Sequence, residues 1–261
     1  MAVIDEAERH QGGGRIIGKI LPAAVRLWLR SQAEQIEDLS ISLSGRDRDI
    51  LSGYLPGVFL HAKRAVYQEL HIGDLHLSAT DIRINVGQVV RGKPLRLLKS
   101  FPVLGELALT ERDLNASLRS PLLSQGLNDF WRSLAQNPSM ASSIKSRYGL
   151  ASSDAEVTLE SAQARLEGER LGLLFYPCVA GTCAEQPIIL AAGLRIVDGN
   201  CLQLIAPQWI DSLEDTVDIT KGESIEALQG FQWDLGSDTQ IERLQVQANQ
   251  IVFEGQLTVN P

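Results

Sequence analysis

The first hydrophobic pattern along the chain has a helical period and covers residues 16–38. At about 100° per residue, cationic side chains fall in one narrow sector of this predicted helix, and apolar side chains take the opposite side. Pro22 either opens the main part of the helix or kinks it. The cations are Arg15, Lys19, Arg26 and Arg30, and the apolar residues are Ile17, Ile20, Leu21, Ala24, Leu27 and Trp28. We therefore expect a long amphipathic helix near the N-terminus.

After this segment the hydrophobic period changes to two, which is typical of half-buried strands. Within residues 70–86 the phase slips at Gly73-Asp74 and again at Thr80-Asp81, and we expect a tight turn or a bulge at each slip. Asp198-Gly199 predicts a hairpin between two alternating runs. The alternating segments are residues 40–44, 58–62, 70–86, 157–159, 171–175, 188–196, 202–204 and 251–259.

Two helices are predicted in the middle of the chain. Thr110 and Asp113 form a pattern like a capping box, which starts a helix that continues toward Pro121. A second helix is expected over residues 122–136, with Leu123, Leu127, Phe130, Trp131 and Leu134 on one side. Residues 137–153 are rich in Ser and are predicted to be a loop.

Composition and length narrow the fold class. The chain has 261 residues with 44% hydrophobic and 5% aromatic residues, so a large and mainly aliphatic core is expected. Residues 1–15 are polar and are predicted to be disordered, and residues 16–261 are predicted to form a single domain. Helices and many alternating strands together predict an α+β protein.

Charge is unevenly distributed along the sequence. Residues 1–100 contain 14 Lys and Arg against 11 Asp and Glu, and residues 101–261 contain 10 against 21. This imbalance does not suit nucleic acid, which requires a sustained basic face, but a basic end suits an anionic membrane surface. The polar start predicts no signal peptide, and no apolar run is long enough to predict a membrane span.

Few residues suggest catalysis or metal binding. The spacing of His61, His71 and His76 matches no common zinc pattern, so no metal site is expected. Three cysteines, an odd and sparse number, fit a reducing compartment and predict reduced thiols. Together with the predicted lack of a signal peptide, they favour a cytoplasmic location, peripheral to a membrane. The segment GGRIIGK lacks the Ser or Thr of a phosphate-binding loop, and no nucleophile elbow is present. We therefore expect neither an enzyme nor a bound cofactor.

Several longer segments resemble a known family. They are LPAAVRLWLRSQ, LSGYLPGVFLHAKRAVYQELHI, LHLSATDIRINVGQVVRGKPLRLL, LALTERDLNASLRSPLL and GFQWDLGSDTQIERLQVQANQIVFEGQLTVNP. Together they resemble the LmeA-like phospholipid-binding family and look closest to its members from photosynthetic bacteria. The resemblance covers residues 16–259. It implies a long, curled antiparallel β-sheet wrapped around the long N-terminal helix, as in tubular lipid-binding folds, with an apolar groove for acyl chains and a role in lipid transfer or envelope lipid metabolism.

The sequence thus predicts a non-catalytic phospholipid-binding protein that docks peripherally on an anionic membrane. A membrane-associated scaffold without a lipid cavity is the alternative, and a lipid hydrolase or transferase is a third reading that lacks a recognisable motif. Candidate residues of the apolar groove are Leu21, Val25, Trp28, Leu29, Phe130 and Trp131. Candidate contacts to lipid headgroups are Lys19, Arg26, Arg30, Lys93 and Arg96.

Overall fold

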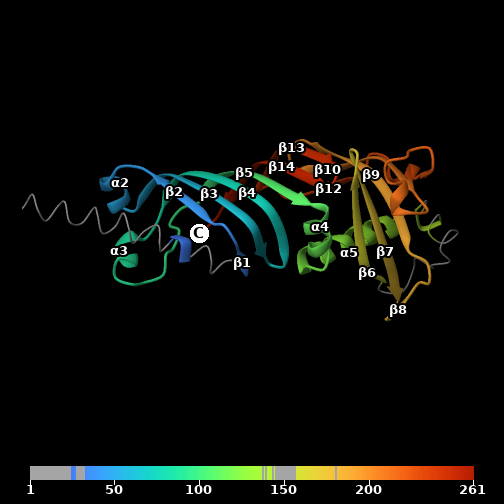
Figure 1. The fold of residues 1–261 in the computed structure, drawn as a ribbon, viewed down its shortest axis with the longest axis horizontal. Helices are drawn as coiled ribbons and strands as arrows, with labels where there is room; N and C mark the ends of the chain where they lie inside the picture. Colours follow the sequence, from blue (N-terminus) through green and yellow to red (C-terminus); the bar gives the residue numbers. More distant parts are fainter. Residues whose placement is uncertain are drawn as a thin grey trace, which may run out of the picture.

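In the computed structural model, the protein is elongated and consists of two antiparallel sheets arranged end to end along its long axis (Figure 1). The structure describes residues 25–27, 33–136, 138, 140–142, 144, 157–179 and 181–261. Over these residues each sheet has seven strands. We call the sheet built from both ends of the chain the terminal sheet, and the sheet built from residues 157–234 the central sheet.

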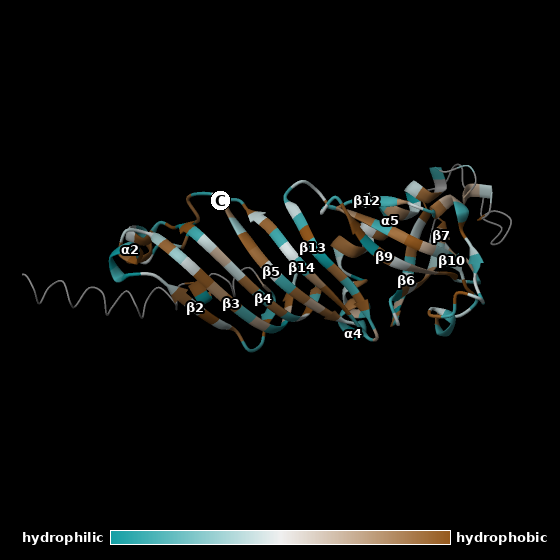
Figure 2. Ribbon diagram, turned by 90° about the horizontal axis from the view of Figure 1, so that it is seen from above, coloured by the Kyte–Doolittle hydropathy of each residue, from teal (hydrophilic) through white to brown (hydrophobic). Residues whose placement is uncertain are grey.

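The terminal sheet has the strand order β1-β3-β4-β5-β14-β13, and β2 pairs with the outer part of β3. Two short helices lie at its outer end, far from the central sheet (Figure 1). Figure 2 shows β2, β3, β4, β5, β14 and β13 side by side in this order. The strands are β1 (Gln35–Ile36), β2 (Ser40–Ser44), β3 (Tyr54–Tyr67), β4 (Leu70–Arg83), β5 (Phe101–Thr110), β13 (Thr239–Gln247) and β14 (Gln250–Val259), and the helices are α2 (Asp47–Leu51) and α3 (Val86–Val89).

The central sheet has the order β11-β10-β9-β7-β6, with β12 on β10 and β8 on β7. The predicted hairpin at Asp198-Gly199 is confirmed, because these residues connect β9 to β10. The elements are β6 (Val157–Glu167), β7 (Arg170–Val179), β8 (Thr182–Cys183), β9 (Ile188–Val197), β10 (Cys201–Trp209), β11 (Glu223–Ser224) and β12 (Gln232–Asp234), with 3-10 turns η1 (Leu213–Asp215) and η2 (Glu226–Leu228).

Both helices expected in the middle of the chain are confirmed. Helix α4 (Glu111–Ser117) starts at a capping box, in which Asp113 N donates to Thr110 Oγ1 and Thr110 N donates to Asp113 Oδ2. Helix α5 (Pro121–Gln136) packs its apolar side on the central sheet. The loop expected from residue 137 is wrong at the described positions 138, 140–142 and 144, which are helical, and Met140 and Ile144 are buried.

The phase slips in residues 70–86 are not turns. Strand β4 is continuous, and its register with β3 is unbroken from Tyr54–Arg83 to Tyr67–Leu70. In β3 and in β4, the alternation of apolar and polar residues shifts by one residue at the same two places along the pair. Arg64 lies at one of these places and Asp81 at the other, and their φ values are positive, 48° and 61°. Because both strands slip together, pairing is kept and the apolar side chains stay on one side of the sheet.

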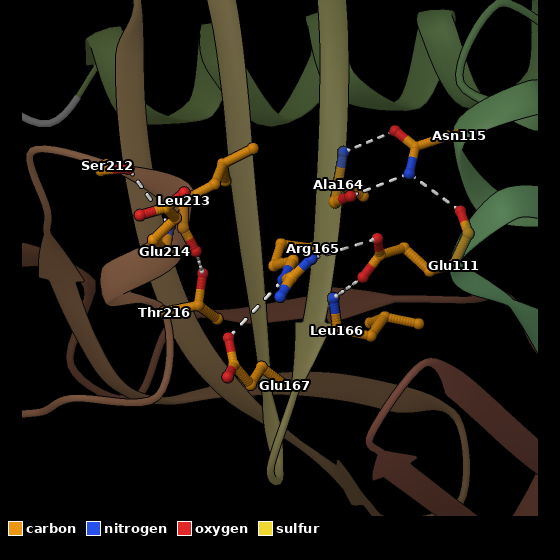
Figure 3. A network of polar contacts seen from close by, with 10 residues as sticks. All are labelled: Glu111, Asn115, Ala164, Arg165, Leu166, Glu167, Ser212, Leu213, Glu214 and Thr216. Carbon is orange, nitrogen blue, oxygen red and sulfur yellow. Dashed lines mark hydrogen bonds and ion pairs between the residues drawn. The ribbon is translucent and has the colours of Figure 1, made fainter.

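Helix α4 joins the two sheets by satisfying the free edge of β6 (Figure 3). The side-chain amide of Asn115 donates to Ala164 O and accepts from Ala164 N, both at 2.8 Å. Leu166 N donates to Glu111 Oε2 at 2.8 Å, and Leu166 O accepts from Asn249 N at 3.1 Å. An exposed sheet edge otherwise pairs with foreign strands, so these bonds both fix the junction and protect the edge.

Two expectations about the fold need correction. The sheet is divided into a terminal and a central sheet, whereas one long curled sheet was predicted, and neither is strongly curled. The predicted helix over residues 16–38 does not reach its expected end, because Gln35–Ile36 pair with β3 as a strand. Within residues 16–38, the described residues 25–27 are helical. The rest of residues 16–32, and the polar residues 1–15, lie outside the described residues. Among the described residues, no helix combines the length and the hydropathy required to cross a bilayer.

Candidate functional site

An apolar cavity of about 220 Å³ lies on one face of the terminal sheet, at its outer end. Alternation along the strands places aliphatic side chains on this face, so the strands supply most of the lining. The described residues that line it are all apolar: Val25, Leu55, Val58, Leu60, Leu77, Ala79, Ile82, Ile84, Leu95, Leu97, Phe101, Val103, Leu257 and Val259. Such a surface offers a ligand hydrocarbon contact and no hydrogen-bonding side chain.

The segment between α3 and β5, residues 90–100, closes the cavity on one side. Asn85 holds it, because its Oδ1 accepts from Arg96 N at 2.8 Å and its Nδ2 donates to Pro94 O at 3.0 Å. Leu95 is thereby buried and Leu97 faces the cavity, whereas the side chain of Leu98 is 61% exposed. Apolar residues of one short segment therefore point both into the cavity and into solvent.

Exposed cations flank this outward-facing leucine in the sequence. Arg91, Lys93, Arg96 and Lys99 are all exposed, and the nearby Val90 is 51% exposed. We call residues 90–100 the basic loop. Because it contributes to the cavity wall, its cations and exposed apolar side chains lie beside the cavity.

The structure divides the predicted groove residues between two places. Val25 lines the cavity of the terminal sheet. Phe130 and Trp131 are buried in the core between α5 and the central sheet, where Trp131 contacts Phe175 edge to face and Phe130 lines a second cavity of about 120 Å³. Of the predicted headgroup contacts, Arg26, Lys93 and Arg96 are exposed. The remaining candidates lie outside the described residues: Leu21, Trp28, Leu29, Lys19 and Arg30.

Apolar side chains continue from the first cavity toward the second. Leu171 and Leu194 line the second cavity and also pack in the cluster at the sheet junction, which includes Phe253. Phe253 lies opposite Leu107 on β5, and Leu107 lies opposite Leu75 on β4, two residues from Leu77 of the first cavity. An apolar face therefore extends from one sheet to the other.

Sequence reasoning missed most of the cavity, because strands contribute more of its lining than helices do. Leu55, Leu77 and Val103 come from β3, β4 and β5, and Val259 comes from the end of the chain. The signal for these residues was the alternation itself. Their meeting depends on the pairing of β5 with β14, which joins segments about 150 residues apart and leaves no local pattern.

The cysteines also differ from expectation. Cys178 and Cys183 form a disulfide between β7 and β8, and Cys201 is free. Reduced thiols were predicted for all three, and this prediction is wrong for the pair. The expected cytoplasmic location was based on the predicted lack of a signal peptide and, in addition, on unpaired thiols. The disulfide removes the second of these supports, because disulfides persist in oxidising compartments.

A cavity lined by hydrocarbon beside an exposed basic segment is the kind of site that suits an apolar or amphiphilic ligand. Comparison with known protein families identifies the family: the model of the LmeA-like phospholipid-binding family matches residues 12–256. The chain therefore belongs to this family, and the resemblance found in its sequence is confirmed. Comparison with curated proteins and with solved structures finds no match. The description of the family names a ligand and no reaction.

Proposed function

We propose that this protein is a non-catalytic phospholipid-binding protein that docks peripherally on a membrane and shelters an acyl chain in the cavity of the terminal sheet. The observation that supports this most strongly is the all-apolar lining among the described residues of that cavity. Each methylene moved from water to such a surface contributes about 0.8 kcal/mol, so hydrocarbon contact alone gives useful affinity. A lipid held in this way is available for transfer between membranes.

The basic loop supports the docking part of the proposal. Arg91, Lys93, Arg96 and Lys99 attract anionic headgroups, each by about 1 kcal/mol near the surface. Leu98 can enter the bilayer interface when the cations contact the headgroups. Because Leu95 and Leu97 of the same segment contribute to the cavity, docking brings the membrane to the cavity wall.

Vesicle flotation tests the docking. We expect the full-length protein to float with vesicles of phosphatidylcholine and phosphatidylglycerol, and to float less at high salt because exposed charges are screened. The double variant Lys93→Glu/Arg96→Glu should lose most of this binding. Arg195→Glu, a single charge reversal, is the control for position, because Arg195 is an exposed cation of the central sheet. Equal flotation of all three proteins would refute docking through the basic loop.

A second measurement separates lipid binding from the scaffold alternative. Mass spectrometry of an organic extract of gently purified protein should detect phospholipid. A folded protein that carries no phospholipid and takes none up from vesicles would favour a scaffold that binds another protein at the membrane.

A further inference from the structure

Two histidines and an aspartate come together on the face of the terminal sheet opposite the apolar cavity. His61 on β3 lies directly across from His76 on β4, and Asp74 precedes His76 by two residues on the same face. Asp74 Oδ1 lies 2.8 Å from His61 Nε2 and 3.3 Å from His76 Nε2. The two imidazole rings stack at 4.1 Å between centroids, with 12° between their planes.

The donor atoms of these three residues are close enough to share one metal ion. Each residue offers one ligand atom, and these atoms all lie within 4.8 Å of one another. Two nitrogens bound to one Zn²⁺ at about 2.0–2.1 Å each are at most about 4.2 Å apart, so small side-chain rotations complete the geometry. All three side chains are between 35% and 56% exposed, so an ion can reach them from solvent.

The surroundings carry more acidic than basic groups. Glu106 lies opposite His76 on β5, and the open hollow bordered by His61 and His76 also contains Glu242 and Glu254. The described cations nearby are Lys63, opposite Asp74, and Arg243, paired with Glu254 at 2.9 Å. Ser40 lies opposite His61 and is neutral. An excess of carboxylates favours a bound cation.

We propose that His61, His76 and Asp74 form a binding site for a divalent first-row transition metal of the Zn²⁺, Ni²⁺ or Cu²⁺ type. Imidazole nitrogens suit these ions, whereas Ca²⁺ and Mg²⁺ require oxygen ligands. The three protein ligands leave further coordination positions to water or to an added anion. The site lies on the opposite face from the lipid cavity and is independent of the proposed lipid function.

Isothermal titration with Ni²⁺ and Zn²⁺ tests the site, with the full-length protein and no affinity tag. We expect one equivalent to bind. His61→Gln, His76→Gln and Asp74→Asn should each weaken binding by at least about tenfold, which is the loss that even an outer partner of a metal ligand can cause. His71→Gln is the control, because His71 is also on β4 but does not belong to the cluster.

Electron paramagnetic resonance of the Cu²⁺-loaded unmodified protein gives a first readout that does not depend on the folding of a variant, and a variant then identifies the ligand. We expect hyperfine coupling to two imidazole nitrogens in the unmodified protein and to one in His76→Gln. The absence of stoichiometric binding, a spectrum without nitrogen coupling, or an equal loss in His71→Gln would overturn the proposal.

Discussion

The substitution Ala79→Phe tests whether the cavity of the terminal sheet holds the acyl chain. Ala79 lies in β4 between Val58 of β3 and Val103 of β5, and all three side chains line the cavity. A phenyl ring at this position occupies space that we assign to the ligand. Because the ring enters an existing apolar cavity of about 220 Å³, we expect the sheet to form as before.

The expected loss of affinity follows from the hydrocarbon that the ring displaces. If the ring excludes about three to four methylenes of the acyl chain, at about 0.8 kcal/mol each, binding weakens by roughly 2.5–3 kcal/mol. That corresponds to an increase in Kd of roughly 100-fold. The substitution leaves the cations of the basic loop unchanged, so flotation with anionic vesicles should change much less than uptake of single lipids.

Titration with a phospholipid that carries a fluorescent acyl chain measures this Kd. The matched control is Ser78→Phe, which adds the same ring one residue earlier, on the opposite face of β4. We expect Ser78→Phe to bind lipid like the unmodified protein. If Ala79→Phe binds the lipid with unchanged affinity while circular dichroism shows a native fold, the acyl chain does not occupy this cavity.

Three further substitutions test the structure that supports the cavity. Asn115→Ala should lower the free energy of unfolding by about 1–3 kcal/mol, because it leaves the N–H and C=O of Ala164 at the β6 edge without their side-chain partner; an unchanged free energy of unfolding would contradict this role. Arg170→Met should cost about 3 kcal/mol or more in urea denaturation, because the buried guanidinium, whose pKa is lowered by desolvation, donates to three main-chain carbonyls; the exposed control Arg195→Met should change little. Replacing Cys178 and Cys183 by Ala should cost about 2 kcal/mol. Thiol titration of the unreduced protein should find one free thiol of three, and three would refute the disulfide.

Local patterns predicted the elements whose determinants lie within a few residues. The capping box of Thr110 and Asp113 identified the start of α4, and Asp198-Gly199 identified the β9–β10 hairpin. Periodicity also gave most of the strands. Periodicity did not show that β4 continues through Asp81. The hydrophobic pattern of β4 shifts by one residue there, and β3 shifts at the opposite position, so the pairing continues. The sequence of β4 alone does not distinguish such a shift from a turn.

Functional residues were harder to predict because their meeting depends on long-range pairing. Phe130 and Trp131 showed the apolar stripe expected of a ligand-lining helix, but the same stripe suits a helix that packs on a sheet. Both side chains are buried against the central sheet, and Phe130 also lines the cavity of about 120 Å³ there. His61 and His76 are separated by a spacing that matches no metal motif, and only the register of β3 with β4 brings them together.

Photo-crosslinking with a phospholipid that carries a diazirine near the end of one acyl chain tests the central claim most directly. After irradiation of the purified complex and digestion, we expect adducts on peptides that contain residues 55–60, 77–84, 95–103 and 257–259, which line the cavity. Adducts confined to the polar face of the terminal sheet, or to the central sheet alone, would show that the acyl chain binds elsewhere.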